Sequence, residues 1–269
     1  MPDVWEIHAL KYAERNERTR NDSFMMDPHH QTQHDMDYYV WLLSNGERSI
    51  LVDTGYDRNE AEARNRPIEQ APAEMLEAFG YPAFRIDEII LTHLHYDHAG
   101  SLKDFPQALL HVQAEEMQFA TGPCMCHEHT RMPFTGEHVC DMVRSLYQGR
   151  VSFCEGSREI APGVECHLVG GHSRGLQCVR VRTRRGWVVL ASDASHYYEN
   201  YRKGKPFPIV VDLENMMRGY DRLRDLADSD DHIIPGHDPL VRAIYPSVTA
   251  GDDRIVLLHA DPQTPEVSS

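Results

Sequence analysis

The sequence predicts one domain of mixed strands and helices, either α/β or a sandwich, and three observations support this prediction. The chain has 269 residues, 41% hydrophobic and 26% charged, which is enough to bury one large core. Strand-like segments lead into helical segments in both halves of the chain, with no linker between them. Histidine and aspartate residues directly follow several apolar strands, where loops can converge over the edge of a sheet.

The N-terminal half is expected to contain short strands joined by turns. The strands are rich in apolar and aromatic residues, and one hairpin turn is marked by Asn45 and Gly46. A polar segment interrupted by proline separates the first two strands and is predicted to be a loop. The expected elements are strands at 4–13, 38–44, 47–56 and 87–92, the loop at 21–36, and a helix at 71–80 that ends at Gly80.

The second half is expected to repeat this style after a helical insert at about 114–149. One more strand, at 107–113, is expected before this insert. After it we expect strands at 151–156, 163–171, 176–183, 186–193 and 231–238, and an amphipathic helix at 213–227. Residues 1–255 are therefore expected to form a single domain, and residues 256–269 a polar C-terminal tail.

Charge and composition narrow the classes of partner. The formal charge of −15 disfavours nucleic acids and anionic membranes, because both would be repelled. No secretory signal is visible, and no apolar stretch reaches the length that crosses a bilayer. The six cysteines lack the spacing of a disulfide framework, so we expect reduced thiols in a cytoplasmic protein. The expected partner is a small-molecule substrate.

The stretch LTHLHYDHAG (91–100) carries the strongest functional signal. His93, His95, Asp97 and His98 lie within six positions, directly after an apolar strand. On a loop that leaves a strand, His93 and His95 can face one metal ion, and Asp97 and His98 a second. Imidazole nitrogens and carboxylate oxygens are the ligands expected for Zn²⁺, and also for Fe or Mn.

Two metal ions need further ligands, and three residues at downstream strand ends are candidates. His172 follows the strand at 163–171, Asp193 ends the strand WVVLASD, and His237 ends the strand HIIPG. An aspartate can bridge two cations through its two oxygens. Taken singly, each residue reads as an ordinary turn or capping residue. Seven ligand-type residues at strand ends together predict a dinuclear metal site.

These motifs resemble the metallo-β-lactamase superfamily. The matching segments are THLHYDHAG, GGHSRG, SDAS and PGHD, in that order, with LVDTGYD before them. The resemblance extends from about Val4 to Val248, and it implies an α/β (α+β) fold, the four-layer αββα sandwich. It places Asp53 behind the metal loop. The implied ligands are His93, His95 and His172 for one metal, Asp97, His98 and His237 for the other, with Asp193 bridging.

Within this superfamily the chain looks most similar to N-acyl homoserine lactonases and 4-pyridoxolactonase-like enzymes. The resemblance implies a hydrolase that opens a cyclic ester, by attack of a metal-bridging hydroxide on the carbonyl carbon. It also suggests a quorum-quenching role. In one respect the sequence departs from the lactonases: three residues after Asp193 they usually carry a tyrosine that contacts the substrate, and this chain has His196.

Two residues are expected to assist catalysis. Asp97, or a metal-bound water, would return a proton to the leaving group. His196 would donate a hydrogen bond to the developing oxyanion, although it is equally compatible with a plain loop residue. Tyr197 or Tyr198 could take the place of the missing tyrosine. Five side chains of irregular segments are expected either to form an apolar substrate pocket or simply to pack: Phe24, Met25, Met26, Met132 and Phe134.

Several alternatives stay open. The bond cleaved could be another ester, a thioester or an amide. A mononuclear iron oxidoreductase that resembles persulfide dioxygenases is a second enzymatic class, and a metal-storing protein a third, non-enzymatic one. The segment CMCHEH (124–129) could hold another metal ion, but it lacks a second cysteine pair at the spacing of a zinc finger. The helical insert could also form the surface of a homodimer.

Overall fold

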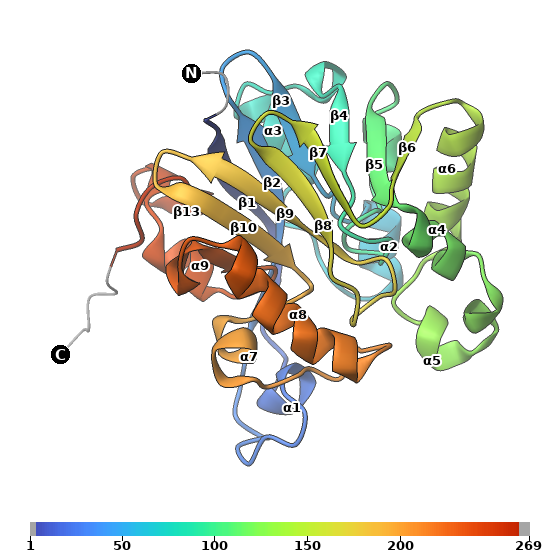
Figure 1. Ribbon diagram of the computed structural model, residues 1–269, viewed down its shortest axis with the longest axis vertical. Coiled ribbons are helices and arrows are strands. Elements are labelled where there is room, and N and C mark those ends of the chain that lie inside the picture. The colour runs from blue at the N-terminus through green and yellow to red at the C-terminus, as the bar shows by residue number, and fades with distance from the viewer. Residues whose placement is uncertain (1–3, 264–269) are drawn as a thin grey trace.

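The computed structural model describes residues 4–263, which form two β-sheets packed face to face with helices on their outer sides (Figure 1). One sheet has eight strands in the order β12-β13-β1-β2-β3-β4-β5-β6, and the other has five in the order β11-β10-β9-β8-β7. The predicted four-layer αββα sandwich is confirmed.

The eight-stranded sheet is antiparallel at one side and parallel from β3 to β6. In spatial order its strands are β12 (Ser247–Thr249), β13 (Asp252–Leu257), β1 (Glu6–Arg15), β2 (Met36–Ser44), β3 (Ser49–Val52), β4 (Glu88–Ile90), β5 (Leu109–Gln113) and β6 (Val151–Cys154). The five-stranded sheet pairs β10 and β11 in parallel and is otherwise antiparallel. Its strands are β11 (Ile233–Pro235), β10 (Gly186–Ser192), β9 (Gln177–Thr183), β8 (Val164–Leu168) and β7 (Ser157–Ala161).

Strand β2 shows why the molecule needs four layers. Its alternate side chains Tyr39, Trp41 and Leu43 belong to the core between the two sheets. Their neighbours Tyr38, Val40 and Leu42 pack on the other face, in a second core beneath the helices. Successive strand residues point to opposite faces, so a strand that is apolar at every position must be covered on both sides.

Helices supply the outer layers. Helix α8 (Leu213–Leu226) packs against β10, and α3 (Pro72–Ala78) and α6 (Gly136–Tyr147) pack against β1 and β6 (Figure 1). The side chain of Asp212 accepts a hydrogen bond from Asn215 N and so caps the start of α8. The other helices are α1 (Arg20–Ser23), α2 (Arg58–Ala63), α4 (Ala114–Ala120), α5 (Glu128–Arg131), α7 (Tyr198–Lys203) and α9 (Leu240–Ile244), with short 3₁₀ turns η1 (Ala83–Arg85), η2 (Leu102–Asp104), η3 (Pro123–Cys126) and η4 (Asp230–His232).

The carboxyl ends of several strands gather at one edge of the sandwich. Strands β3 and β4 are parallel neighbours in one sheet, and β10 and β11 are parallel neighbours in the other. Each of the four ends directly before a segment that carries a predicted functional residue. This edge is where open sheets of this kind bind ligands.

The predicted C-terminal tail at 256–269 is wrong in its first residues. Strand β13 continues to Leu257, Val256 and Leu258 are fully buried, and Ile7 N donates a hydrogen bond to His259 Nδ1 (3.0 Å). The charged residues at the start of β13 conceal its apolar side in the sequence, because only alternate residues face the core. Residues 264–269 of the predicted tail lie outside the described residues.

Two further expectations concern helices and thiols. Among the described residues, no helix combines the length and apolar character that crossing a membrane requires. All six cysteines are free thiols, and three of them are buried. The predicted loop at 21–36 begins with the single turn of α1 and is otherwise irregular.

The substitution Leu258→Ala should lower the free energy of unfolding by about 2–4 kcal/mol, because it leaves a cavity in the core between the sheets. Leu258 is 0% exposed, whereas Leu240 on α9 is 37% exposed. Leu240→Ala is therefore the control, with an expected loss below about 1 kcal/mol. Chemical denaturation followed by circular dichroism gives both values, and equal losses would show that residues beyond 255 do not belong to the core.

Candidate metal centre

The structure brings all seven predicted ligand residues together at the edge where the strands end. The segment after β4 carries four of them, and three further loops each carry one. Their ligand atoms form overlapping groups in which all atoms lie within 4.8 Å of one another. The groups are His93, His95 and His172; His93, His98 and Asp193; Asp97, His98 and His237; and His172, Asp193 and His196.

Asp193 lies between two sets of imidazoles. Its Oδ2 atom is 3.1 Å from His172 Nε2 and 3.9 Å from His93 Nε2. Its Oδ1 atom is 3.0 Å from His237 Nε2 and 3.3 Å from His98 Nε2. The two oxygens of one carboxylate therefore face two different sets of nitrogens, which is the arrangement that a bridging aspartate requires.

Asp97 completes the second set. Its Oδ2 atom is 3.7 Å from His98 Nε2 and 3.8 Å from His237 Nε2. In the first set, His95 Nδ1 lies 2.9 Å from His172 Nε2, and the ring centroids of His93 and His95 are 4.4 Å apart. The cluster thus divides into a side with three imidazoles and a side with two imidazoles and a carboxylate.

Hydrogen bonds fix how three imidazoles are turned. His98 Nδ1 donates to Asp53 Oδ2 (2.7 Å), His172 Nδ1 to the Ile209 carbonyl (2.7 Å), and His237 Nδ1 to the Asp37 carbonyl (2.8 Å). Each bond engages Nδ1 and aims Nε2 into the cluster, where the neutral form of the ring offers its lone pair. Partners of this kind orient histidine ligands in metal sites.

The residues present fit a divalent cation. His93 Nε2, His98 Nε2 and Asp193 Oδ1 are buried and have no hydrogen-bond partner among the described residues. Burial lowers the pKa of His93 and His95 well below the usual range, so both rings are neutral and offer lone pairs. Buried polar atoms without partners are costly, and cations would satisfy them.

Two turns of the site adopt strained backbone conformations. Asp53 and Ser192 have φ angles of 61° and 47°, which side chains other than glycine adopt rarely. Asp53 Oδ1 accepts from Thr92 N (2.8 Å), and Thr92 Oγ1 contacts Ser192 Oγ (2.9 Å), so the two turns hold each other. A Cβ atom at Gly236 would lie 2.7 Å from the Ser192 carbonyl oxygen, so only glycine lets the His237 loop approach this closely.

Glu116 is a functional residue that the sequence did not reveal. It is fully buried on α4, where Oε1 accepts from Leu94 N (3.0 Å) and Oε2 accepts from Ser173 Oγ (2.5 Å) and Gly175 N (2.9 Å). It therefore ties the loop of His93 and His95 to the loop of His172. In the sequence Glu116 is an ordinary acidic residue in the first turn of a helix, because its role exists only once both loops have met.

His196 belongs to the cluster rather than to a solvated loop. Its Nε2 atom is 2.9 Å from Asp193 Oδ2, and its ring stacks on Phe207 with centroids 3.6 Å apart. Its Nδ1 atom is buried and has no partner among the described residues. Neither neighbouring tyrosine lines the cleft over the cluster, and Tyr197 instead donates its hydroxyl to the Asp35 carbonyl.

The cleft over the cluster is more polar than expected. Of the five residues expected either to form an apolar pocket or to pack, none lines the cleft: Phe24, for example, is buried in the core beneath the helices, and Met26 is 96% exposed. Phe134 does reach the site, with its ring 4.5 Å from that of His95. Besides the cluster itself, the cleft is lined by Arg15, Arg18, Met36, Tyr38, Arg66, Tyr96, Pro133 and Ile209.

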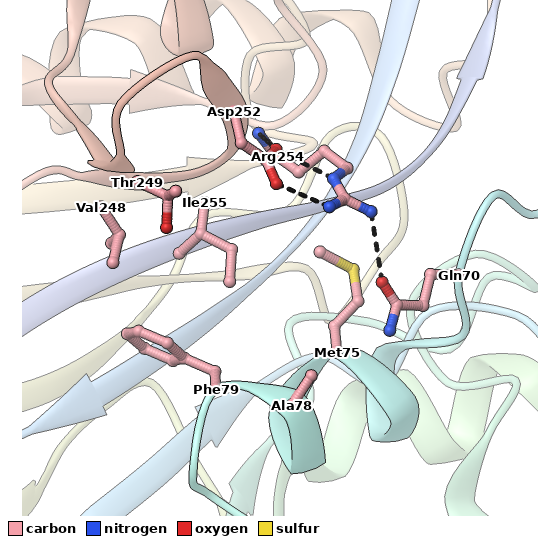
Figure 2. Close-up of a pocket in the computed structure, with 9 residues that line it drawn as sticks. All are labelled: Gln70, Met75, Ala78, Phe79, Val248, Thr249, Asp252, Arg254 and Ile255. Atoms are coloured by element: carbon pink, nitrogen blue, oxygen red, sulfur yellow. Dashed lines mark hydrogen bonds and ion pairs between the residues drawn. The ribbon is translucent and has the colours of Figure 1, made fainter.

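Two other places in the described part of the molecule lie outside the cleft and offer no free chemical groups of this kind. The segment 124–129 gathers no metal-binding group among the described residues. A pocket of about 170 Å³ between α3 and the β12–β13 hairpin shares no lining residue with the cleft (Figure 2). Its charged groups, Asp252 and Arg254, pair with each other at 2.6 Å, so neither is left for chemistry.

The chain belongs to the metallo-β-lactamase superfamily, whose family model matches residues 36–237. The matched range contains all seven residues of the candidate metal centre. Together with its lactonase relatives, this match confirms the predicted enzyme class, a metal-dependent hydrolase. The resemblance seen in the sequence is thereby confirmed as well.

Relatives of this chain include N-acyl homoserine lactonases. An N-acyl homoserine lactonase of Bacillus cereus is 28% identical over 74% of this chain and 80% of its own length. A probable metallo-hydrolase of Mycobacterium tuberculosis is 28% identical over 74% of this chain and 69% of its own. The crystal structure of a quorum-quenching N-acyl homoserine lactone lactonase superposes with a TM-score of 0.74 at 25% identity, covering 89% of this chain and 94% of that one.

Replacing Glu116 with glutamine should destabilise the protein by about 1–3 kcal/mol, since the amide puts a donor where Oε1 or Oε2 now accepts. The neighbouring Glu115 is exposed, so Glu115→Gln is the matched control. Thermal unfolding of the metal-free proteins measures the difference. If Glu116→Gln unfolds at the temperature of the control, Glu116 does not hold the two loops together.

Proposed function

We propose that this protein is a dinuclear-metal hydrolase that opens a cyclic ester, with a lactone as the favoured substrate. One observation carries the proposal: the two oxygens of Asp193 face two separate sets of histidine nitrogens. The lactonase relatives support the choice of substrate class.

In this proposal Asp193 is shared by two ions. One ion is held by His93, His95 and His172, and the other by Asp97, His98 and His237. The mixture of imidazole and carboxylate favours Zn²⁺, and Fe or Mn would also suit it. The excess of negative charge around His98 supports this assignment. Burial opposes the charged form of this imidazole, yet the surrounding carboxylates, led by that of Asp193, raise its pKa well above the usual range.

When bound, such a pair of ions supplies a water of lowered pKa and polarises an ester carbonyl. The chain's own groups would do the rest. The Asp97 carboxylate, at the rim of the cluster, is placed to take a proton and return it to the leaving alkoxide. His196 would donate a ring N–H toward the oxyanion, and its stacking on Phe207 holds the ring beside Asp193.

An N-acyl homoserine lactone is the substrate that the relatives suggest, with quorum quenching as the associated role. Other esters, thioesters and amides use the same chemistry and stay as alternatives. A mononuclear iron oxidoreductase is less well supported, because three protein ligands would serve it and this cluster offers seven. A cytoplasmic location and a homodimer stay predictions.

The ligand assignment is tested with Asp193→Asn and His95→Ala. The wild-type protein should contain two equivalents of metal and hydrolyse a lactone, and either variant should lose metal and at least about 100-fold in kcat/KM. Metal is measured by mass spectrometry after dialysis, and turnover by release of acid from a panel of lactones.

His167→Ala provides the control for these variants. His167 is buried but bonds to Ser157 Oγ (2.9 Å) and Glu165 Oε2 (2.9 Å) on the five-stranded sheet, outside the cluster. It should keep both metals and full turnover. Full metal content and activity in Asp193→Asn would rule out the shared carboxylate.

The role of His196 is tested with His196→Gln and His196→Phe. Loss of an oxyanion donor should lower kcat by roughly 10²-fold, while metal content stays at two equivalents. Glutamine can still donate a hydrogen bond, so it should recover part of the kcat that phenylalanine loses. Unchanged kcat in both variants would make His196 a packing residue only, and loss of metal in both would make it a ligand.

A further inference from the structure

We propose that the arginine triad of the cleft, Arg15, Arg18 and Arg66, binds an anionic group of the substrate, so the ester that this enzyme opens carries a carboxylate or a phosphate. This inference rests on the proposed function and narrows its substrate class. A neutral acyl chain, as in an N-acyl homoserine lactone, would leave these charges unused.

The triad comes from three separate segments. Arg15 is the last residue of β1, Arg18 follows in the loop before α1, and Arg66 lies beyond α2. All three line the same cleft as Asp97, Asp193 and four of the histidines, which are His95, His172, His196 and His237. Three cations thus surround a cleft with two carboxylates, in a chain whose formal charge is −15.

None of the three takes part in an ion pair with any residue that the structure describes. Nearby arginines behave differently: Arg20 pairs with Asp27 (2.7 Å) and Glu199 (2.9 Å), and Arg64 pairs with Glu60. The chain has an excess of acidic residues, so partners for the triad would have been easy to supply. The guanidinium groups of the cleft are left for another anion.

Arg18 makes the strongest case, because it is only 7% exposed. Its Nη2 atom donates to the Asp22 carbonyl (2.8 Å), which helps to hold α1. Its Nε atom is buried and has no hydrogen-bond partner among the described residues. A guanidinium that is buried without a carboxylate is unfavourable, and a bound anion would remove that cost.

Arg66 links the triad to the metal cluster. Its Nη1 atom donates to the Tyr96 hydroxyl, which lies 3.1 Å from the Tyr38 hydroxyl. The ring of Tyr38 in turn packs edge-on against His237, with centroids 5.2 Å apart. An anion held by Arg66 would therefore lie beside the side of the cluster that contains Asp97 and His237. Planar guanidinium groups suit the paired oxygens of carboxylate and phosphate alike.

The test compares charged and neutral lactones of the same ring. The carboxylate probe is 5-oxotetrahydrofuran-2-carboxylate, with its carboxamide as the neutral partner. The phosphate probe is the phosphate ester of 5-(hydroxymethyl)oxolan-2-one, with the parent alcohol as its partner. The wild-type enzyme should prefer the anionic member of at least one pair by about 10–100-fold in kcat/KM, the size expected for one charged hydrogen bond or two. The preferred pair identifies the anion.

Arg15→Gln and Arg66→Gln should each reduce this preference about tenfold or more, because each removes a charged partner of the anion. Arg254→Gln, which removes the same charge from the exposed surface of β13, should leave it unchanged. At Arg18 the substitution is Arg18→Lys, because Arg18→Gln would remove the charge and also loosen α1. Arg18→Lys keeps the charge, so it should retain the larger share of the preference for the anionic probe. Equal kcat/KM for charged and neutral members, or equal losses on both in the variants, would overturn the proposal.

A binding measurement separates this proposal from the hydrolase proposal. Calorimetry with the metal-free protein should show tighter binding of an anionic probe than of its neutral partner, and Arg66→Gln should abolish the difference. That result would support the triad even if no lactone were hydrolysed. Indifference of the wild-type protein to the charge of the probe would overturn the inference, whether or not lactones are hydrolysed.

Discussion

The buried carboxylate of Asp193 is the constraint on which the site depends. Burial opposes its ionisation, yet the surrounding imidazoles, His237 and His98 first among them, hold its pKa well below the usual range. An ionised carboxylate in a dry interior, beside imidazole nitrogens that have no hydrogen-bond partner among the described residues, would be costly without cations. The fold holds these groups together in spite of that cost. It does so through two strained turns, a close glycine contact at Gly236 and the bridging hydrogen bonds of Glu116.

The edge of the sandwich explains how distant residues reach one point. The proposed ligand residues follow β4 in one sheet and β8, β10 and β11 in the other, and each is placed by the strand before it. Rigid strands beneath short loops fix the positions of side chains better than long loops could, and preorganisation of this kind is what metal-assisted hydrolysis needs. The arginine triad lines the cleft over the cluster, where it would select a substrate without altering the residues proposed as ligands.

Much of this could be predicted from the sequence, for identifiable physical reasons. His93 to His98 stand out because four ligand-type residues in six positions are rare outside a metal site. His172, Asp193 and His237 could be found because each directly follows an apolar strand. The layers followed from the resemblance of these motifs to a known superfamily, and strands such as β2 agree with it because both of their faces are apolar.

The rest depends on contacts that no local pattern encodes. Glu116 and the arginine triad gain their roles only when separate segments meet, and the sequence shows them as ordinary charged residues. Phe24 and Met26 were expected either to share a pocket or to pack, because hydrophobicity alone does not say which side chain turns inward. Strand β13 was not predicted, because the residues on its exposed face are charged and therefore look like those of a polar tail.

Anomalous diffraction from crystals grown with Zn²⁺ tests the central claim most directly. The account predicts two peaks, about 3.5–4 Å apart, one on each side of the Asp193 carboxylate. One peak should lie among His93, His95 and His172, and the other among Asp97, His98 and His237. A single peak, or two peaks that are not both next to the Asp193 carboxylate, would contradict the proposal that Asp193 is shared by two ions.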